Sequence, residues 1–251
     1  MARLDGRVSV ITGAGSGIGR ASALAFAAEG SSVVVADLDV SAAQETVSQI
    51  QSSGEAIACR VDVADAAQVD AMLQEAVDRF GKVDVLFNNA GLPQAFTPAE
   101  ESSDELFDRI MNVNVRGVFN GCRAAIPRMK AQGGGVILNT ASTAGIRPRP
   151  GLAVYNASKA AVISLTKTLA LELAPHRIRV VSICPVATDT PMLPTFLGMD
   201  EAEGRKRFIS TIPWGRLNRP EDIASAAVFL ASADAEMVTG TAFEVDGGRD
   251  V

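Results

Sequence analysis

The chain has 251 residues, with 23 basic and 29 acidic side chains and a formal net charge of −6. Its hydrophobic content of 47% is typical of a globular protein and too high for a disordered chain. The acidic balance argues against a nucleic-acid partner, and no apolar run approaches the length that crosses a bilayer. Three widely spaced cysteines favour reduced thiols, as in a cytoplasmic protein. Without a long apolar run, we expect no membrane partner. The single histidine excludes a metal site built from several histidines, and we expect no metal.

Short apolar runs rich in β-branched residues alternate with longer, alanine-rich amphipathic segments along the whole chain. Strands that are apolar on both faces and separated by helices are typical of βαβ units, in which helices cover both faces of a parallel sheet. No repeat or linker divides the sequence, so we expect a single domain over residues 1–251, with a substrate-loop insertion at about 186–219. The predicted strands are 8–12, 32–37, 56–61, 83–88, 135–140, 178–184 and 242–245, and the predicted helices are 18–30, 41–52, 66–80, 104–131, 152–174 and 220–232.

A glycine-rich turn follows the first predicted strand, where residues 12–19 read Thr-Gly-Ala-Gly-Ser-Gly-Ile-Gly. Glycines permit a tight turn and let backbone amides approach a pyrophosphate, and the following helix N-terminus adds partial positive charge. The spacing is TGxxxGxG rather than GxGxxG, because Arg20 occupies the position where the last glycine would stand. A glycine cluster can serve only as a strand–helix turn, but its place after the first strand indicates a dinucleotide site.

Asp37 ends the second predicted strand, 18 residues beyond Gly19. An acidic side chain there can accept hydrogen bonds from both ribose hydroxyls of the adenosine half, and it repels a 2′-phosphate. Ala14 and Leu38 offer no basic group, so the sequence predicts a preference for NAD(H) over NADP(H). An ordinary solvated aspartate is the alternative. Asp62, after the third strand, is predicted to meet the adenine, with turn formation as its competing explanation.

The sole tyrosine, Tyr155, stands four residues before Lys159 in a predicted amphipathic helix, so both side chains lie on one helical face. A free phenol with a pKa near 10 is a poor base at neutral pH. An ammonium ion about 4 Å away could lower that pKa by up to about three units, before desolvation is subtracted. The pair therefore fits acid/base chemistry, although this spacing alone is also common in surface pairs.

Further motifs accompany this pair in chain order. They are the Thr-Gly-x-x-x-Gly-Ile-Gly turn, the Asn88-Asn89-Ala90-Gly91 run, Asn114, and Ser142, thirteen residues before Tyr155. With them, the chain resembles the short-chain dehydrogenase/reductase family over essentially its whole length. The resemblance implies an α/β, Rossmann-like fold with three αβα layers around a doubly wound, seven-stranded parallel sheet. It also implies oxidoreductase activity and usually a homotetramer.

The resemblance implies four catalytic roles. Tyr155 resembles the general acid/base, and Lys159 resembles the residue that lowers the phenol pKa and holds the nicotinamide ribose. Ser142 resembles the donor to the substrate oxygen, and Asn114 resembles the residue that holds a water linking Lys159 to solvent. From the residues alone, Ser142 could merely cap a strand end, and Asn114 could satisfy buried backbone groups.

The same resemblance implies where a cofactor would lie. Residues 89–91 resemble the turn beside the adenosine, and Thr190 resembles the threonine that meets the nicotinamide carboxamide. The predicted cofactor-binding residues are Gly13, Ser16, Gly17, Ile18, Gly19, Asp37, Leu38, Asp62, Val63, Asn89, Ala90, Gly91, Tyr155, Lys159, Pro185, Thr188 and Thr190.

Val186 departs from the family pattern, which usually has glycine after this proline. A branched side chain narrows the backbone options and could project into the nicotinamide or substrate space. Apolar side chains around the catalytic residues predict a pocket that suits a secondary alcohol or ketone, although they could instead pack against one another. The predicted substrate-binding residues are Ser142, Leu92, Leu152, Tyr155, Val186 and Met192.

Arg147 and Arg149 lie between Ser142 and Tyr155 in the sequence, which predicts a place near the mouth of the cleft. They could hold a carboxylate or phosphate on the substrate. Solvated loop arginines or salt bridges between subunits are the alternatives.

Together these features predict an NAD(H)-dependent enzyme that interconverts a secondary alcohol and a ketone. A 3-oxoacyl thioester reductase and a polyol or sugar dehydrogenase are two candidates, and the first fits Asp37 poorly because many such reductases use NADPH. The alternative function is a non-catalytic, NAD-sensing binding protein, which would not need Ser142, Tyr155 and Lys159 together. Apolar residues on more than one face of helices 104–131 and 152–174 predict a homotetramer or a dimer.

Overall fold

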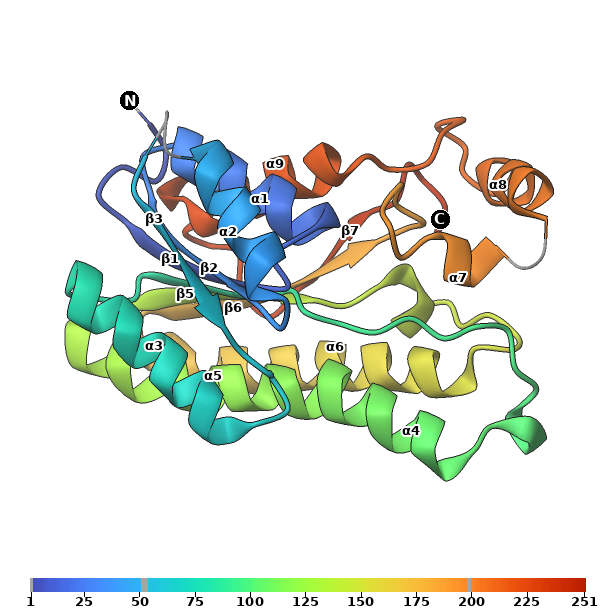
Figure 1. Cartoon of the computed structure of the whole chain (residues 1–251), viewed down its shortest axis with the longest axis horizontal. Helices are drawn as coiled ribbons and strands as arrows, with labels where there is room; N and C mark the ends of the chain where they lie inside the picture. Colours follow the sequence, from blue (N-terminus) through green and yellow to red (C-terminus); the bar gives the residue numbers. More distant parts are fainter. Residues whose placement is uncertain (1, 51–53, 198–199) are drawn as a thin grey trace.

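Seven parallel strands form one sheet between two helical layers in the computed structural model, which describes residues 2–50, 54–197 and 200–251 (Figure 1). The strand order is β3-β2-β1-β4-β5-β6-β7. This arrangement confirms the predicted doubly wound αβα fold. The strands are β1 (Val8–Thr12), β2 (Ser32–Asp37), β3 (Ala56–Arg60), β4 (Val85–Asn88), β5 (Gly135–Thr140), β6 (Ile178–Pro185) and β7 (Ala242–Val245).

Helices α1, α2 and α9 cover one face of the sheet, and α3, α5 and α6 cover the other (Figure 1). Within the described ranges, none of the helices is long and apolar enough to cross a membrane. The bounds are α1 (Gly17–Ala28), α2 (Val40–Ile50), α3 (Ala66–Phe80), α4 (Asp104–Met111), α5 (Gly117–Gln132), α6 (Ala153–Leu173), α7 (Pro194–Leu197), α8 (Glu201–Ile209) and α9 (Pro220–Ala231).

Alternate residues of each central strand enter two separate hydrophobic cores, one on each face of the sheet. In β2, Val34 and Ala36 pack with the helices α3, α5 and α6, whereas Val33 and Val35 pack with α1, α2 and α9. All four side chains are fully buried. Burial on both faces explains why the strands read as continuous apolar runs rather than as alternating patterns.

The predicted strands agree with the structure to within two residues at each end. The uninterrupted helix predicted over 104–131 is wrong at its centre, because a π-helical turn, η2 (Asn112–Arg116), separates α4 from α5. A π-turn keeps the chain helical over 112–116, so the sequence shows no helix end there that would reveal it. The last residues of the helix predicted over 41–52 lie outside the described residues.

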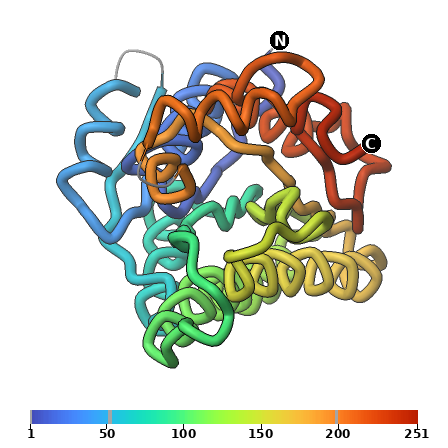
Figure 2. The backbone as a smooth tube through the Cα atoms, turned by 90° about the vertical axis from the view of Figure 1, so that its right-hand side faces the viewer, coloured from blue at the N-terminus to red at the C-terminus, as the bar shows by residue number. Residues whose placement is uncertain are grey.

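The carboxyl ends of the strands form the edge on which a ligand is expected. The chain leaves β1 and β4 in opposite directions, and ligands of open parallel sheets bind at such a switch point. The segment 186–219, which carries α7 and α8, lies at this end of the molecule, on the same side as the loop that leads into α6 (Figure 2).

A buried polar chain ties this part of the sheet to helix α6. The Asn88 side-chain amide donates to Oδ1 of Asn139 (2.9 Å), and the Asn139 amide donates to Oγ1 of Thr166 (3.0 Å). Asn139 and Thr166 are fully buried. Because a buried donor without an acceptor destabilises the folded protein, these hydrogen bonds fix the position of α6 on β5.

We expect Thr166→Val to lower the free energy of unfolding by about 1–3 kcal/mol, because it leaves the buried Asn139 amide without its acceptor. Urea unfolding followed by circular dichroism measures the change. Thr168→Val is the matched control on the same helix, because Thr168 is exposed and its hydroxyl bonds only to the Ser164 carbonyl. Equal losses in the two variants would contradict the assignment.

Candidate active site

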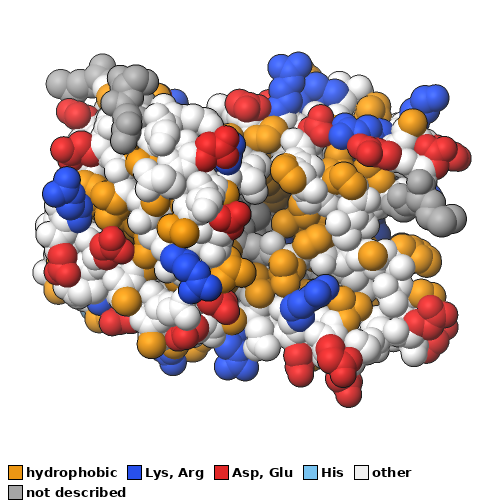
Figure 3. Space-filling view, viewed as in Figure 1, with side chains coloured by type: hydrophobic (Ala, Val, Ile, Leu, Met, Phe, Trp, Pro, Cys, Tyr) orange, Lys and Arg blue, Asp and Glu red, His pale blue; other side chains and the backbone are white. Residues whose placement is uncertain are grey.

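A cavity of about 650 Å³ opens at the carboxyl ends of the strands. Hydrophobic side chains gather around a hollow on the face of the molecule seen in Figure 3. The predicted residues that line the cavity are Gly13, Ser16, Gly17, Ile18, Asp37, Leu38, Asp62, Val63, Asn89, Ala90, Gly91, Leu92, Ser142, Tyr155, Lys159, Pro185, Val186, Thr188, Thr190 and Met192. Three predicted residues do not line it: Gly19, Asn114 and Leu152.

The glycine turn between β1 and α1 packs too closely against β4 for larger residues. Gly13 has a φ of +64°, and a Cβ atom there would lie 2.9 Å from the Ala90 Cα. A Cβ on Gly19 would overlap the Gly13 carbonyl oxygen and lie 2.7 Å from Nδ2 of Asn89, so Gly19 serves close packing rather than ligand contact. Ser16, the N-cap of α1, makes no side-chain capping bond, so the first amides of α1 have no side-chain acceptor at the cavity.

Asp37 lies at the end of β2 and braces the glycine turn. Its carboxylate accepts the amides of Gly15 (2.8 Å) and Asp39 (3.0 Å), and it lines the cavity. The nearby Arg20 donates to the Gly15 carbonyl (3.0 Å) and forms an ion pair with Glu45 (2.7 Å). The Arg20 charge is therefore paired, and the Asp37 carboxylate is held in a defined orientation.

Asp62 fills the turn-forming role that was its alternative explanation. Its Oδ1 accepts the amide of Ala64 (2.9 Å) just after β3. Asp62 and Val63 also line the cavity, and their contact with an adenine stays a prediction.

Asn89 locks the carboxyl ends of three strands together. Its side-chain amide donates to the Thr12 carbonyl (3.0 Å), and its Oδ1 accepts the Thr140 hydroxyl (3.1 Å). The Thr12 hydroxyl in turn accepts the backbone amides of Asn89 (3.0 Å) and Ala90 (3.1 Å). These bonds hold β1, β4 and β5 in register at the floor of the cavity.

Ser142, Tyr155 and Lys159 lie together in the cavity. Ser142 follows β5, and its hydroxyl accepts the Ala144 amide (3.1 Å), so it caps the short helix Thr143–Gly145 rather than a strand end, and it lies close enough to the Tyr155 phenol to lower the phenol pKa. The Lys159 ammonium lies 5.7 Å from the Tyr155 ring centroid and donates to the Thr140 carbonyl (2.7 Å). The side chains of Tyr155 and Lys159 are buried and lie on one face of α6, as the spacing predicts.

Asn114 joins the π-turn η2 to two neighbouring segments. Its Oδ1 accepts the Leu92 amide (2.7 Å), and its Nδ2 donates to the Leu92 carbonyl (3.0 Å) and to Oγ of Ser158 (3.1 Å). A Cβ built on Gly91 would lie 3.3 Å from Oδ1 of Asn114 and 3.5 Å from Nζ of Lys159. Asn114 thus satisfies buried backbone groups, and its Oδ1 and the Lys159 ammonium both lie close to Gly91.

Gln94 and Leu152 both contact Tyr155. Gln94, which the sequence did not single out, is fully buried and accepts the Tyr155 amide through Oε1 (2.9 Å). Leu152, predicted to line the pocket, packs with Ala144, Phe196 and the Tyr155 ring instead. As the residue just before α6, it points into the protein. No spacing rule marks Gln94, because its contact joins a loop to the first turn of α6, 61 residues further along the chain.

Burial shifts the pKa of both Tyr155 and Lys159. Burial raises the pKa of Tyr155, and the Ser142 hydrogen bond and the charge of Arg149 lower it. Burial also lowers the pKa of Lys159 to about 8. The Lys159 ammonium donates to the Thr140 carbonyl, and its lowering of the phenol pKa stays a prediction.

Distant segments bring further residues to the cavity that the sequence did not reveal. Arg109 comes from α4, Phe208 from α8, and Arg249 from the C-terminal turn. Val186 also lines the cavity and is almost fully buried, because it packs with Leu193 and other apolar residues of the segment 186–219. These arrangements depend on tertiary packing, which no local pattern encodes.

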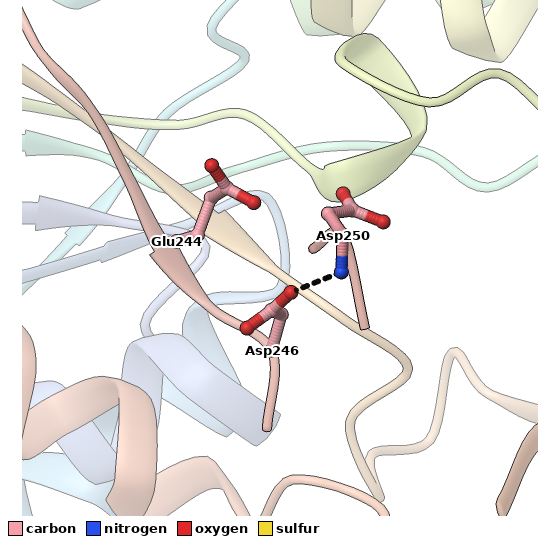
Figure 4. A group of neighbouring side chains, drawn as sticks. All are labelled: Glu244, Asp246 and Asp250. Atoms are coloured by element: carbon pink, nitrogen blue, oxygen red, sulfur yellow. Dashed lines mark hydrogen bonds between the residues drawn. The ribbon is translucent and has the colours of Figure 1, made fainter. Parts of the chain in front are cut away.

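Carboxylates of Glu244, Asp246 and Asp250 gather beside the C-terminal turn, with one oxygen of each within 4.8 Å of the others (Figure 4). Asp246 is committed to the turn, because its two oxygens accept the amides of Gly248 (2.9 Å) and Asp250 (2.8 Å). Burial raises the pKa values of Glu244 and Asp250. The cluster therefore has a structural role, and the expected absence of a metal site stays a prediction.

Comparisons with known proteins agree with this geometry. A family model described as enoyl-(acyl carrier protein) reductase matches residues 13–250. The chain is 41% identical to a 4-formylbenzenesulfonate dehydrogenase of Comamonas testosteroni, over 99% of each chain, and 38% identical to a 3-oxoacyl-[acyl-carrier-protein] reductase of Thermotoga maritima, over 98% of each. The crystal structure of a 3-ketoacyl-(acyl-carrier-protein) reductase from Brucella melitensis complexed with NADH is 49% identical, with a TM-score of 0.93, and the match covers 99% of this chain and 100% of that one.

We expect Lys159→Met to stabilise the cofactor-free protein relative to wild type at pH 7.5, and the advantage to shrink by about 3 kcal/mol at pH 10.5. The folded pKa of Lys159, about 8, lies below the ordinary lysine value of 10.5, so between these two pH values the unfolded chain binds more protons than the folded protein. The destabilisation that the buried Lys159 ammonium causes is therefore complete below pH 8, and it is lost as the pH rises towards 10.5 and the folded protein holds a neutral amine. Urea unfolding of both proteins at the two pH values measures it.

Lys167→Met is the matched control, because Lys167 lies on the same helix and is exposed. Its stability difference from wild type should stay constant to within about 0.5 kcal/mol over the same pH range. A constant difference for Lys159→Met as well would show that Lys159 is not buried as the structure indicates.

Proposed function

The chain belongs to the short-chain dehydrogenase/reductase family, and from that premise we propose that it is an NAD(H)-preferring enzyme that interconverts a secondary alcohol and a ketone. One observation carries the proposal: Ser142, Tyr155 and Lys159 line the same cavity as the glycine turn and Asp37. A protein that only senses a dinucleotide has no need of a buried phenol, hydroxyl and ammonium beside it. The family relatives are oxidoreductases, which supports the catalytic function over the sensor.

The residues of the cavity fit a nicotinamide dinucleotide. The amides at the start of α1, together with the glycine turn, suit a pyrophosphate. Asp37 would hold the adenosine ribose, Asp62 and Val63 would contact the adenine, and Lys159 would hold the nicotinamide ribose. The neighbouring protein from Brucella melitensis was crystallised with NADH, which supports the same cofactor class here.

When bound, the cofactor supplies a hydride acceptor or donor. Tyr155 would take the alcohol proton during oxidation and return a proton to the developing alkoxide during reduction. Ser142 would donate a hydrogen bond to the same oxygen and stabilise its negative charge. Asn114 would connect Lys159 to solvent, and Gln94 would keep Tyr155 in place by accepting its backbone amide.

The preference for NAD(H) rests on the fixed carboxylate of Asp37. A 2′-phosphate would meet this negative charge, and the nearby Arg20 is already paired with Glu45. Leu38, beside Asp37, is exposed and neutral, so it offers the phosphate no positive charge. The same features disfavour an NADPH-dependent 3-oxoacyl thioester reductase. Of the two candidate substrate classes, they therefore favour a polyol or sugar alcohol.

The proposal extends to the assembly and the location of the protein. Large apolar side chains such as Phe107 on α4, Phe119 on α5 and Leu171 on α6 are exposed, which supports a homotetramer formed through these helices. The cysteines are all unpaired, which supports a cytoplasmic location. We also propose that residues 186–219 act as the substrate loop of a single domain spanning 1–251.

We expect Tyr155→Phe to lower kcat for the reduction of a ketone by about 10²–10⁴-fold, because it removes the group that supplies the proton. The affinity for NADH should stay within about twofold, since the ring and its packing remain. Stopped-flow absorbance of NADH measures the turnover, and NADH fluorescence measures the binding. A variant that retains a tenth of the wild-type rate would exclude Tyr155 as the acid/base.

We expect Asp37→Asn to raise the ratio of kcat/KM with NADPH to that with NADH by at least about tenfold. The change removes the charge that would repel a 2′-phosphate and keeps an oxygen that can accept the Gly15 amide. Steady-state kinetics with both cofactors gives the ratio. The control is Asp39→Asn, an exposed neighbour that does not line the cavity, which should leave the ratio unchanged.

A further inference from the structure

Arg149 lies in the cavity without a partner of opposite charge. Its guanidinium lies over the Phe208 ring, with Cζ 4.4 Å from the ring centroid, and the residue is half-buried. Over residues 2–50, 54–197 and 200–251, no carboxylate lies within 4.0 Å of its nitrogens. A charge that is partly withdrawn from water is costly unless it is paired, so this position calls for an explanation.

The charges nearest to Arg149 make its position less favourable still. Burial lowers the pKa of Arg149 to about 10, and the charges of Arg249 and Arg207 act in the same direction against an opposing effect of Tyr155, so Arg149 remains charged at neutral pH. Arg249 lies 3.8 Å from the Asp250 carboxylate and donates to Oγ1 of Thr211 (2.6 Å). Arg149 and Arg249 both line the cavity, and of these two only Arg249 has a carboxylate within 4.0 Å, so the charge of Arg149 is available to attract an anion.

The loop that carries Arg149 is fixed to the catalytic helix. Asn156, the residue after Tyr155, donates from Nδ2 to the Arg149 carbonyl (2.8 Å). The Thr97 amide holds the same loop by donating to the Gly151 carbonyl (2.9 Å). The guanidinium is close enough to the phenol for its charge to lower the Tyr155 pKa. Arg149 is therefore held in a defined place beside the proposed acid/base, within one cavity.

We propose that Arg149 binds an anionic group of the substrate, a carboxylate or a sulfonate, while the carbon that is oxidised or reduced lies against Tyr155. A guanidinium can donate two parallel hydrogen bonds to such an oxyanion. The Arg149 Cζ lies over the Phe208 ring, and among the described residues no group accepts a hydrogen bond from the guanidinium nitrogens, which leaves them for these bonds. The inference rests on the proposed function, because it concerns the other end of the same substrate.

The test compares ketones that differ only in charge. We pair 4-acetylbenzoate with 4-acetylbenzamide and acetoacetate with acetoacetamide, so that the anion lies at two different distances from the ketone. Calorimetry measures their binding to the wild-type enzyme loaded with NAD⁺, which cannot reduce them, and to the enzyme without cofactor. We expect the anion of at least one pair to bind at least about tenfold more tightly than its amide.

Arg149→Gln should reduce this preference to within about twofold and leave the affinity of the amide unchanged. Arg149→Lys should keep part of it, because lysine retains the charge but not the paired donors. Arg147→Gln is the matched control from the same loop. Arg147 is exposed, does not line the cavity and donates to the Arg249 carbonyl, so the preference should survive its replacement.

Equal binding of the charged and neutral members of both pairs, or no binding of any of them, would overturn the proposal. So would an equal effect of the Arg147 and Arg149 variants. The wild-type comparison needs no variant, so it decides the matter even if Arg149→Gln does not fold. Failure of the wild-type enzyme to oxidise NADH with any ketone would count against the proposed function, while the binding preference would still report on Arg149 itself.

Discussion

The bonds that Asn89 makes at the carboxyl edge of the sheet are the constraint on which the cavity depends. Thr12, Asn89 and Thr140 lie at the ends of three neighbouring strands, where the Asn89 side chain bonds to the Thr12 carbonyl and the Thr140 hydroxyl, and the Asn89 backbone amide donates to the Thr12 hydroxyl. Parallel strands end together at this edge, so their carbonyls and side chains would otherwise face the cavity unpaired. With the edge fixed, the glycine turn can approach β4 closely, and Lys159 can bond to the Thr140 carbonyl.

Burial, rather than a single ion pair, sets the charges in the site. The phenol of Tyr155 and the ammonium of Lys159 are both buried, and burial shifts each pKa towards the neutral form. The sequence spacing placed these groups on one face of α6, but it did not show where the ammonium points. The charge of Arg149 lowers the phenol pKa. Arg149 comes from a loop that the sequence marked only as a possible anion contact.

Local patterns were sufficient for the sheet and for the glycine turn. The β-branched runs gave the strands to within two residues, and Asp65 caps α3 as its residue type suggests, by accepting the Ala67 and Gln68 amides. The π-turn η2, the backing of Tyr155 by Gln94, and the approach of Phe208 to the cavity were not predictable. The π-turn leaves no mark because the chain stays helical through it, and the other two depend on contacts between segments far apart in sequence.

The π-turn η2 also sets which face α5 turns towards the sheet. A residue added to a helix rotates everything after it by about 100° relative to an uninterrupted α-helix. In the observed phase, α5 presents Gly117 to Val63 and Gly121 to Asn88, at contacts that leave no room for a Cβ atom. Deleting one residue from the turn would bring bulkier side chains to these contacts and withdraw Asn114. The residue that the π-turn adds is therefore what places Gly117 and Gly121 at these close contacts.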